Sequence, residues 1–396
     1  MLVLFFWLCV AAVVYTYAGY PLLLFLAGRL RPQRRLPAAE LPHVTLLIAA
    51  YNEEDVIADK LEHSLQLDYP REKLQILVAA DGSDDATPDI VRRYKDRGVD
   101  LSYSPPRRGK MAAITNALAQ ARGSVVIITD ANNEYNKESL RLLVAPYADP
   151  KVGAVGGAKH IVQDGAGLSA SEGLYWRYES FIKQQESRLG SCVAMPGEIL
   201  SFRRELFEPP QRPVIMDDIY VAMLILRKGY RIAYEPRAKS YEYVSPTAQD
   251  EFERRARNVA GRYQAAMMLP AKLFWRRPVV MWQWMSHKFM RMLLPFAMLG
   301  ALVTNILLVV WPPEPSATWD WVGMSPPYGW IVLVLQILFY LLAWIGSRVQ
   351  VGGVIGKLLY LPSFLVSSNM AGLAGFLRHV TRRQAATWRR VTRLRH

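Results

Sequence analysis

Residues 74–85 have the sequence LQILVAADGSDD, a run of aliphatic side chains that ends directly in an acidic turn. The same arrangement recurs in VTLLIAAYNEE at 44–54 and in SVVIITDAN at 124–132, and a fourth apolar run, VGAVGGA, lies at 152–158. Short Val/Ile/Leu runs bounded by turn residues are typical of buried strands. The segments between the first three runs have the mixed polarity of helices, at residues 53–67, 86–97 and 110–121. This alternation predicts an α/β domain with a mostly parallel sheet whose faces are covered by helices.

Polar clusters stand where the predicted strands end. In open α/β sheets, ligands bind at the carboxyl ends of the strands. Each cluster alone is an ordinary turn or helix cap, but four of them in order along one domain predict a functional site. The clusters are Tyr51-Asn52-Glu53, Asp81-Gly82-Ser83-Asp84-Asp85, Thr129-Asp130-Ala131-Asn132 and, before a helical segment, Met216-Asp217-Asp218.

The chain is both basic and apolar. Of its 396 residues, 52% are hydrophobic and 21% are charged, and the formal net charge is +14. A strongly basic chain suggests an anionic partner, such as nucleic acid, a membrane surface or a phosphorylated substrate. A nucleic-acid-binding protein should be more polar, so the composition argues against nucleic acid and favours a membrane protein with a soluble part. Two cysteines are too few for a disulfide framework, and the six histidines lack metal-ligand spacing.

Three apolar stretches, at residues 2–27, 288–311 and 329–346, are predicted to cross a bilayer, whose apolar core is about 30 Å thick. The link at 312–328 has no Lys or Arg and is predicted to lie outside. The positive-inside rule places the amino terminus outside and the following domain in the cytoplasm, because the first stretch is followed by Arg29, Arg31, Arg34 and Arg35.

A further apolar stretch, residues 358–377, conflicts with the charge rule if it spans. Crossing here would export an acid-free tail that contains Arg378, Arg382, Arg383, Arg389, Arg390, Arg393 and Arg395. We therefore interpret residues 358–377 as re-entrant or interfacial, with the basic tail in the cytoplasm. There the tail either rests on lipid headgroups or helps to cover the functional site. Much of the net positive charge thus reports topology and not a nucleic-acid partner.

The order of the motifs resembles that of membrane-embedded family 2 glycosyltransferases, the group that contains cellulose, hyaluronan and related polysaccharide synthases. The resemblance covers about residues 42–265 and implies a GT-A fold, a Rossmann-like α/β domain that transfers sugars. Besides the four polar clusters, it rests on Arg108-Gly109-Lys110 and on the Gly-Tyr-Arg…Tyr-Glu-Pro stretch at 229–236.

The resemblance implies a divalent metal, Mg²⁺ or Mn²⁺, held at Asp130. Such a cation suits a nucleotide diphosphate sugar because it neutralises charge on the departing diphosphate. Related synthases usually have Asp-x-Asp at this turn, whereas this chain has Asn132 as the second residue. An amide oxygen can ligate a metal but brings no charge, so Asn132 is expected to be the weaker ligand.

The resemblance also implies a pocket for a UDP-sugar. Asp81 corresponds to the residue that hydrogen-bonds the uracil base, and Asn52 and Glu53 belong to the same nucleotide pocket. Lys110 corresponds to a basic residue near the diphosphate or donor sugar. The plainer interpretation of Lys110 is a solvated lysine that opens a helix.

Asp218 is the predicted general base. An inverting transfer needs a carboxylate that takes the proton of the acceptor hydroxyl as its oxygen attacks the anomeric carbon. The like charge of Asp217 could raise the pKa of Asp218 towards that task. The family usually has Glu-Asp at this pair, and its second member is the base. Gly197-Glu198-Ile199 resembles the acceptor-side loop of these enzymes.

The motif Gln-x-x-Arg-Trp of the processive synthases is altered in this chain. Arg257 matches its arginine, which would bind the diphosphate, while Arg254 replaces the glutamine and Asn258 the tryptophan. Since that tryptophan stacks on the acceptor sugar, its absence puts processive polymerisation in doubt. Trp176, with Tyr175 and Tyr178 beside it, offers an alternative stacking platform, and packing is an equal interpretation.

These observations predict an integral inner-membrane (plasma-membrane) protein whose GT-A domain is cytosolic. The expected parts are a transmembrane anchor at 1–28, a basic cytosolic linker at 29–41, the GT-A domain at 42–244, amphipathic interfacial helices at 245–287, two transmembrane helices with an outside hairpin at 288–347, and the re-entrant or interfacial segment with the basic tail at 348–396.

The predicted activity is an inverting, metal-dependent transfer of a sugar from a UDP-sugar to a glycan or lipid-linked acceptor, in polysaccharide synthesis. Three spans are few for a polymer channel, so export would need a homo-oligomer or a partner protein. An alternative enzyme adds a single sugar to polyprenyl phosphate or another lipid carrier. An alternative of another class is a non-catalytic membrane scaffold or transport component that binds nucleotide or anionic lipid, in which the acidic clusters need not converge.

Overall fold

The computed structural model describes residues 1–31, 40–162, 167–243, 247–267, 276–315, 320–349 and 353–385. The chain forms two compact units. The first contains the membrane-type helices and comprises Met1–Leu23, Glu251–Ala260 and Trp284–Arg382. The second contains the sheet and comprises Leu24–Asp250, Gly261–Gln283 and Arg383–His396.

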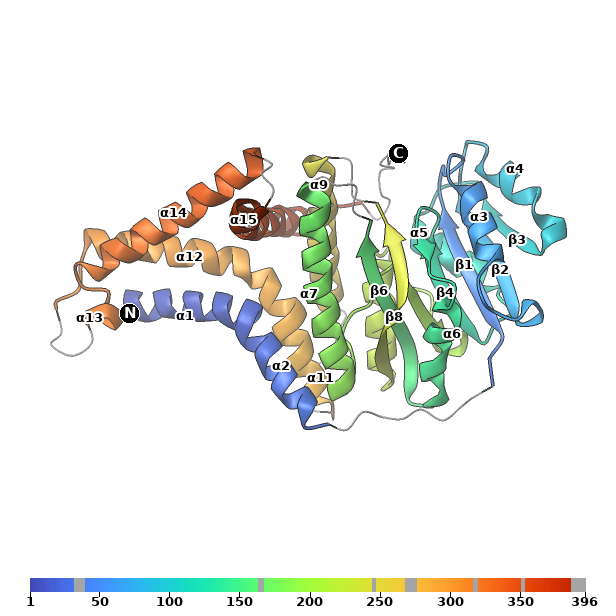
Figure 1. Ribbon diagram of the computed structural model, residues 1–396, viewed down its shortest axis with the longest axis horizontal. Helices are drawn as coiled ribbons and strands as arrows, with labels where there is room; N and C mark the ends of the chain where they lie inside the picture. The colour runs from blue at the N-terminus through green and yellow to red at the C-terminus, as the bar shows by residue number, and fades with distance from the viewer. Residues whose placement is uncertain are drawn as a thin grey trace. The chain divides into compact units, whose positions relative to one another are not determined.

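The second unit is built on one eight-stranded sheet with the order β3-β2-β1-β4-β7-β6-β8-β5 (Figure 1). β3, β2, β1 and β4 are parallel, β7 is antiparallel to both of its neighbours, and β6 and β8 are parallel. The strands are β1 (Val44–Ala50), β2 (Leu74–Asp81), β3 (Val99–Ser104), β4 (Val125–Asp130), β5 (Glu134–Tyr135), β6 (Val152–Ile161), β7 (Leu200–Arg203) and β8 (Arg231–Glu242).

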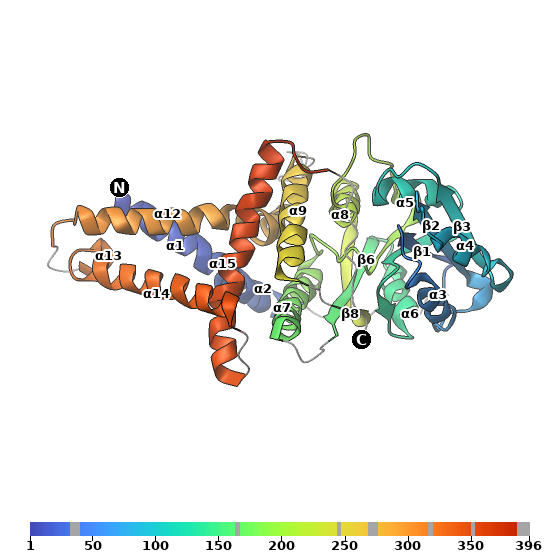
Figure 2. The ribbon, with the colours of Figure 1, turned by 90° about the horizontal axis from the view of Figure 1, so that it is seen from above.

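Helices cover this sheet, as the sequence predicted. One core joins the even-numbered side chains of β1 to apolar residues of α3, α4 and α6. α5 contacts β1, β2 and β3, and α7 and α8 contact β6 and β8 (Figures 1 and 2). The helices are α3 (Ile57–Leu65), α4 (Thr87–Arg92), α5 (Lys110–Leu118), α6 (Ser139–Val144), α7 (Gly167–Leu189) and α8 (Asp217–Arg227).

The strand register brings the predicted site residues to one edge. In the parallel pairs, Ala50 of β1 aligns with Ala80 of β2, and Ala49 aligns with Asp130 of β4. Asp81 and Asp130 are the last residues of their strands, so both lie at the carboxyl edge of the sheet. The α/β prediction is therefore confirmed, with a mixed sheet in place of a mostly parallel one.

The first unit is helical. A continuous helix covers Leu2–Arg29 as α1 (Leu2–Val14), a π-helical turn at Tyr15–Gly19 and α2 (Tyr20–Arg29). It packs along α12 (Met290–Val310), where Phe6 and Cys9 contact Ala301 and Leu308. The unit also contains α13 (Asp320–Gly323), α14 (Tyr328–Arg348), α15 (Gly353–Val380) and the middle of α9 (Ala248–Ala266), while α11 (Pro278–Trp284) joins the units in sequence.

Four helices of the described residues are long and apolar enough to cross a membrane: Leu2–Arg29, Pro278–Val310, Tyr328–Arg348 and Leu358–Val380. The first and third contain the spans predicted at 2–27 and 329–346, and the second contains all but the last residue of the span predicted at 288–311. The fourth contains residues 358–377, which form the middle of one unbroken helix despite an internal proline, Pro362. Their re-entrant or interfacial placement stays a prediction.

α15 packs closely against the middle of α9. A Cβ on Gly375 would lie 2.5 Å from the carbonyl oxygen of Ala256, so the two backbones touch there. Polar contacts flank this point: Arg255 donates to Ser368 at 2.6 Å, and Arg378 pairs with Glu253 at 2.8 Å. α9, which lies within the predicted interfacial segment 245–287, and the apolar stretch at 358–377 thus form one packed pair.

Candidate active site

Asp81 shapes the turn that precedes α5. Its two carboxylate oxygens accept hydrogen bonds from the backbone N–H groups of Arg108 and Gly109, each at 2.8 Å. The turn passes so close to Gly82 that a Cβ there would lie 2.5 Å from the backbone nitrogen of Arg107. Asp81 is almost fully buried. Its predicted contact with the uracil base remains a prediction, and its contact with this turn is an additional role.

Lys110, the first residue of α5, joins two of the acidic clusters. Its ammonium lies 2.7 Å from Oδ1 of Asp130 and 3.0 Å from Oδ2 of Asp217. Burial alone would lower the pKa of Lys110, but the charges of Asp130 and Asp217 raise it above its ordinary value. Lys110 is therefore a charged residue at the centre of the site and not a solvated helix-opening lysine.

Asp218 lies beside this group at the start of α8. Burial, followed by the charge of Asp217, raises the pKa of the Asp218 carboxyl to about 7. The backbone N–H of Ile219, which donates to Oδ1 at 2.8 Å, and the charge of Lys110 act in the opposite direction. A carboxyl that titrates near neutrality is suited to accept a proton from a hydroxyl group.

The loop at 197–198 lies against Asp218. A Cβ placed on Gly197 would be 3.4 Å from Cβ of Asp218, an ordinary contact distance. The side chain of the next residue, Glu198, pairs with Lys159 of β6 at 3.2 Å. Lys159 also pairs with Glu242 of β8, so one buried ammonium is shared by two carboxylates. The predicted acceptor-side loop thus borders the predicted base.

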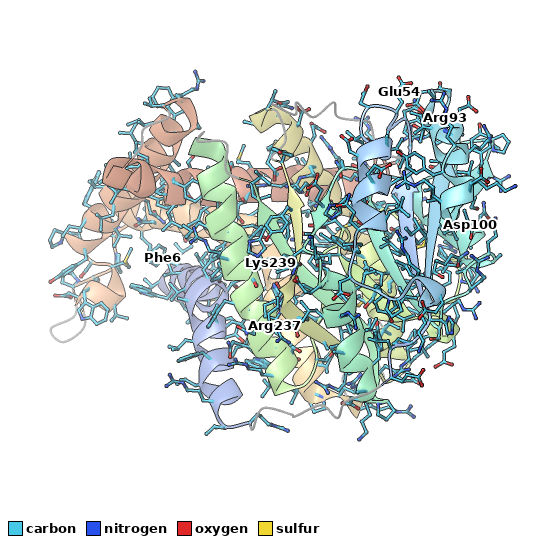
Figure 3. All side chains as sticks on the ribbon, turned by 45° about the vertical axis from the view of Figure 1, so that its right-hand side comes forward. Phe6, Glu54, Arg93, Asp100, Arg237 and Lys239 are labelled. Carbon is cyan, nitrogen blue, oxygen red and sulfur yellow. The ribbon has the colours of Figure 1, made fainter. Side chains whose placement is uncertain are left out.

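The turn at 51–53 is tied to the turn after β2. Asn52 has a left-handed backbone, and its side-chain amide exchanges hydrogen bonds with Asp84. The backbone N–H of Glu53 donates to Thr87 Oγ1 at 2.8 Å. Glu54, labelled in Figure 3, accepts from the N–H of Ala86 at 3.0 Å. The two loops therefore form one connected edge of the predicted nucleotide pocket.

Trp176, on α7, lies beside two ammonium groups. Nζ of Lys159 is 5.1 Å and Nζ of Lys183 is 5.5 Å from the centre of its ring system. Because Lys159 also binds Glu198, Trp176 belongs to the group of side chains that borders the acceptor-side loop. Its role as a stacking platform stays a prediction.

Arg254 and Arg257 lie on α9, within the part that belongs to the helical unit. Arg254 pairs with Glu251 at 2.7 Å, and the neighbouring Arg255 pairs with the same carboxylate at 2.8 Å. The shared acid holds the two arginines on one side of the helix. The predicted contact of Arg254 and Arg257 with the diphosphate stays a prediction.

The side chains that could bind a metal ion fit an ion that takes most of its ligands from the substrate. Asp130 lies at the strand end with its side chain 37% exposed, and Asn132 follows two residues later, partly buried. Among the residues that the structure describes, no group of three or more His, Cys, Asp or Glu side chains could hold a metal by itself. Mg²⁺ and Mn²⁺ bound with phosphates commonly use one or two protein carboxylates and complete their shell with substrate and water oxygens.

Sequence reasoning missed Lys159 and a second buried lysine, Lys60. Lys60 is 3% exposed on α3, where its Nζ lies 2.9 Å from Thr129 Oγ1. In the sequence, a lysine within a helix of mixed polarity looks like a solvated residue. A signal for a buried lysine was the sequence Thr129-Asp130-Ala131-Asn132-Asn133, whose hydroxyl and amide oxygens become buried acceptors for a cation.

Comparison with known proteins finds sequence relatives of this chain among the glycosyltransferases. The family described as Glycosyl transferase family 2 matches residues 45–209. A probable glycosyltransferase of Bacillus subtilis, YdaM, is 26% identical over 78% of this chain and 74% of its own length. The poly-beta-1,6-N-acetyl-D-glucosamine synthase of Staphylococcus aureus is 29% identical over 58% of this chain, and the match spans only 56% of that synthase.

Among solved structures, a mannosyltransferase from Pyrobaculum calidifontis, in complex with GDP-Man and Mn²⁺, superposes with a TM-score of 0.69 at 22% sequence identity. The superposition covers 96% of this chain and 99% of that one, which shows a shared fold. Three of the four polar clusters lie within the residues that this family model matches. Residues 45–209 of the chain thus match glycosyl transferase family 2, and the chain has the GT-A fold.

Proposed function

We propose that this protein is an inverting membrane glycosyltransferase that moves a sugar from a UDP-sugar to a glycan or lipid-linked acceptor, in polysaccharide synthesis. One observation carries the proposal: Lys110 binds Asp130 and Asp217 at once, with Asp218 adjacent. A non-catalytic scaffold would have no need for this convergence. The catalytic domain lies on the cytosolic side of the inner membrane, and nucleotide sugars are found in the cytosol.

In the proposed reaction, Asp218 takes the proton of the acceptor hydroxyl while its oxygen bonds to the anomeric carbon. The bond between that carbon and the diphosphate oxygen breaks, and UDP leaves with the bonding electrons. Lys110 faces the developing negative charge, which a preorganised ammonium in a buried site stabilises strongly. Asp130 and Asn132 would hold Mg²⁺ or Mn²⁺, which neutralises further charge on the diphosphate.

The donor assignment rests on Asp81, Asn52 and Glu53. These residues line one edge of the sheet, and their loops are joined by hydrogen bonds. The mannosyltransferase with the same fold holds GDP-Man, so a guanine nucleotide is the direct competitor of the uridine nucleotide in this proposal. A donor screen that contains both classes decides between them.

The number of sugars added per acceptor is the open part of the proposal. The chain matches just over half the length of the curated polysaccharide synthase, and Asn258 replaces the tryptophan of the processive motif. The replacement of the tryptophan favours limited addition to a lipid carrier as the second candidate. Polysaccharide synthesis remains the first candidate because of the family motifs and the basic Arg-Gly-Lys turn before α5.

The test is a donor screen with detergent-purified full-length protein and with membranes, which measures nucleotide release and product length. Asp218→Asn should abolish transfer by about 10³-fold or more, since it removes the base with little change in shape. Asp96→Asn, the same change at an exposed aspartate, is the matched control. Unchanged turnover in Asp218→Asn would remove Asp218 as the base, and products one sugar longer than the acceptor would select the second candidate.

A further inference from the structure

A buried ammonium lies directly behind the turn that contains Asp130. Lys60 projects from α3 and is 3% exposed. Its Nζ has three oxygen acceptors: Thr129 Oγ1 at 2.9 Å, the backbone carbonyl of Asn133 at 2.7 Å and Asn133 Oδ1 at 2.8 Å. The ring of Tyr135 lies 5.0 Å from the same nitrogen. Thr129 and Asn133 are the residues that begin and end this turn, so Lys60 binds both of its ends.

Asn133 continues the contact to the other side of the site. Its Nδ2 donates to the carbonyl oxygen of Glu198 at 2.9 Å and to Ser240 Oγ at 2.6 Å. Lysine only donates and a carbonyl only accepts, so the amide orientation is fixed by its two neighbours. The Thr129 hydroxyl donates to Asn133 Oδ1 at 2.8 Å and completes the network.

The two ends of this network have different predicted roles. The turn from Thr129 to Asn133 contains the proposed metal ligands, and Asp130 within it binds Lys110. The carbonyl of Glu198 belongs to the loop whose Gly197 lies against Asp218. Tyr135 reinforces this second end, because its hydroxyl donates to the same Glu198 carbonyl at 2.8 Å. One buried network therefore joins the donor side and the acceptor side.

We propose that Lys60 is a positioning residue that, through Asn133, fixes the distance between the metal-binding turn and the acceptor-side loop. The inference rests on the proposed function, because it concerns the spacing of donor and acceptor in that reaction. Lys60 touches neither reactant and acts through Thr129 and Asn133. Small displacements of catalytic groups reduce rates greatly, so a fixed spacing is of direct value.

An apolar side chain could fill the same volume but would not donate to the backbone carbonyl of Asn133. Asn133 Oδ1 would keep the hydrogen bond from Thr129, but the carbonyl is buried, and an unsatisfied acceptor in such a place is unfavourable. We expect the turn to rotate towards other donors, and Asp130 to move with it. The effect should appear in metal-dependent nucleotide binding as well as in turnover, which separates positioning from chemistry.

Two variants test the two arms of the network separately. The metal-side arm is the set of hydrogen bonds from Lys60 to Thr129 and Asn133, and the acceptor-side arm is the pair of hydrogen bonds from Asn133 to Glu198 and Ser240. Lys60→Met removes the ammonium and should loosen both arms. Asn133→Asp keeps an oxygen that pairs with Lys60 but removes the two donations to Glu198 and Ser240, so it should loosen only the acceptor-side arm. Lys95→Met, the same change at an exposed lysine of the sheet-containing unit, is the control.

Three quantities are measured on the purified full-length protein: Mn²⁺-dependent UDP binding by calorimetry, donor hydrolysis to water, and transfer to acceptor with separate kcat and KM. Lys60→Met should weaken Mn²⁺-dependent UDP binding about 10-fold and lower transfer about 100-fold, as for groups that orient metal ligands. Asn133→Asp should leave UDP binding and hydrolysis within about 3-fold of wild type and lower transfer about 10-fold.

The outcomes separate the inference from the proposed function. A wild-type protein that transfers no sugar refutes the proposed function and the inference with it. If the wild type is active and Lys60→Met binds UDP and transfers as well as Lys95→Met, only the inference fails. A fall in Tm with an unchanged ratio of transfer to hydrolysis in Asn133→Asp also overturns it, because that result indicates a purely structural role.

Discussion

At the scale of a single residue, the pKa of the Asp218 carboxyl is subject to opposing influences. Burial and the neighbouring charge of Asp217 raise its pKa to about 7, while the amide of Ile219 and the charge of Lys110 act to lower it. Below that pH the carboxyl is mostly protonated and cannot accept a proton. The activity of the proposed enzyme should therefore depend on pH in the physiological range.

We expect kcat/KM for transfer to rise tenfold per pH unit below about pH 7 and to level off above it, because the free enzyme must carry an ionised Asp218. Asp217→Asn removes the like charge and should move this limb to lower pH. The measurement is a pH–rate profile of both proteins between pH 5 and 9. An acid limb at the same pH in Asp217→Asn would show that the charge of Asp217 does not raise the pKa of Asp218.

The same shift predicts a change in stability with a definite sign. A carboxyl whose folded pKa exceeds its unfolded value costs stability as pH rises from the unfolded pKa to the folded one. Asp218→Asn removes that cost, so its Tm relative to wild type should be higher at pH 8 than at pH 4. Thermal unfolding of both proteins at the two pH values checks this. A difference in Tm that does not change with pH would show that the pKa of Asp218 is not shifted.

At the scale of elements, the loops after the strands depend on close backbone contacts. Gly82 has a positive φ of 64°, and a Cβ there would lie 2.5 Å from the backbone of the turn that precedes Lys110. Gly98 also has a positive φ, of 85°, but no atom lies within 4 Å of its Cβ position. The pair therefore separates backbone strain from collision with the turn.

Gly82→Ala should destabilise the protein by about 2–4 kcal/mol and raise the KM for the donor, because strain and collision add there. Gly98→Ala should cost only about 1 kcal/mol, from backbone strain, with an unchanged KM. Denaturant unfolding and donor kinetics on both variants test this. Equal donor KM values in the two variants would show that the turn at 107–109 does not position Lys110 for the donor.

The elements also show what could be predicted from the sequence. The apolar runs at 44–50 and 74–81 coincide with β1 and β2, because both are uninterrupted and almost entirely buried. β3 was missed because polar residues interrupt its apolar pattern, and β7 was missed because it has only four residues. β8 was missed because Pro236 and a bulge obscure its pattern. The acidic clusters were identified since carboxylates at strand ends are visible in sequence. The buried partners Lys60 and Lys159 were not, because burial of a lysine is decided by distant acceptors.

At the scale of the whole molecule, charge and apolarity predict a membrane topology. Four helices of the described residues are long and apolar enough to span, whereas the positive-inside rule predicts three spans and a cytoplasmic carboxyl tail. The ion pair of Arg378 with Glu253 and the bond of Arg255 to Ser368 also join α15 to a charged amphipathic helix. These polar contacts are compatible with the predicted interfacial placement of residues 358–377.

Cysteine labelling tests this topology, because both native cysteines are buried. Glu314→Cys, in the predicted outside hairpin, should react with a membrane-impermeant maleimide in intact cells. Asp96→Cys, in the sheet-containing domain, and Ala385→Cys, after α15, should react only after permeabilisation. Since all three positions are exposed, differences in labelling report the side of the membrane and not burial. Labelling of Ala385→Cys in intact cells, with Asp96→Cys protected, would establish α15 as a fourth span and place the basic tail outside, against the positive-inside rule.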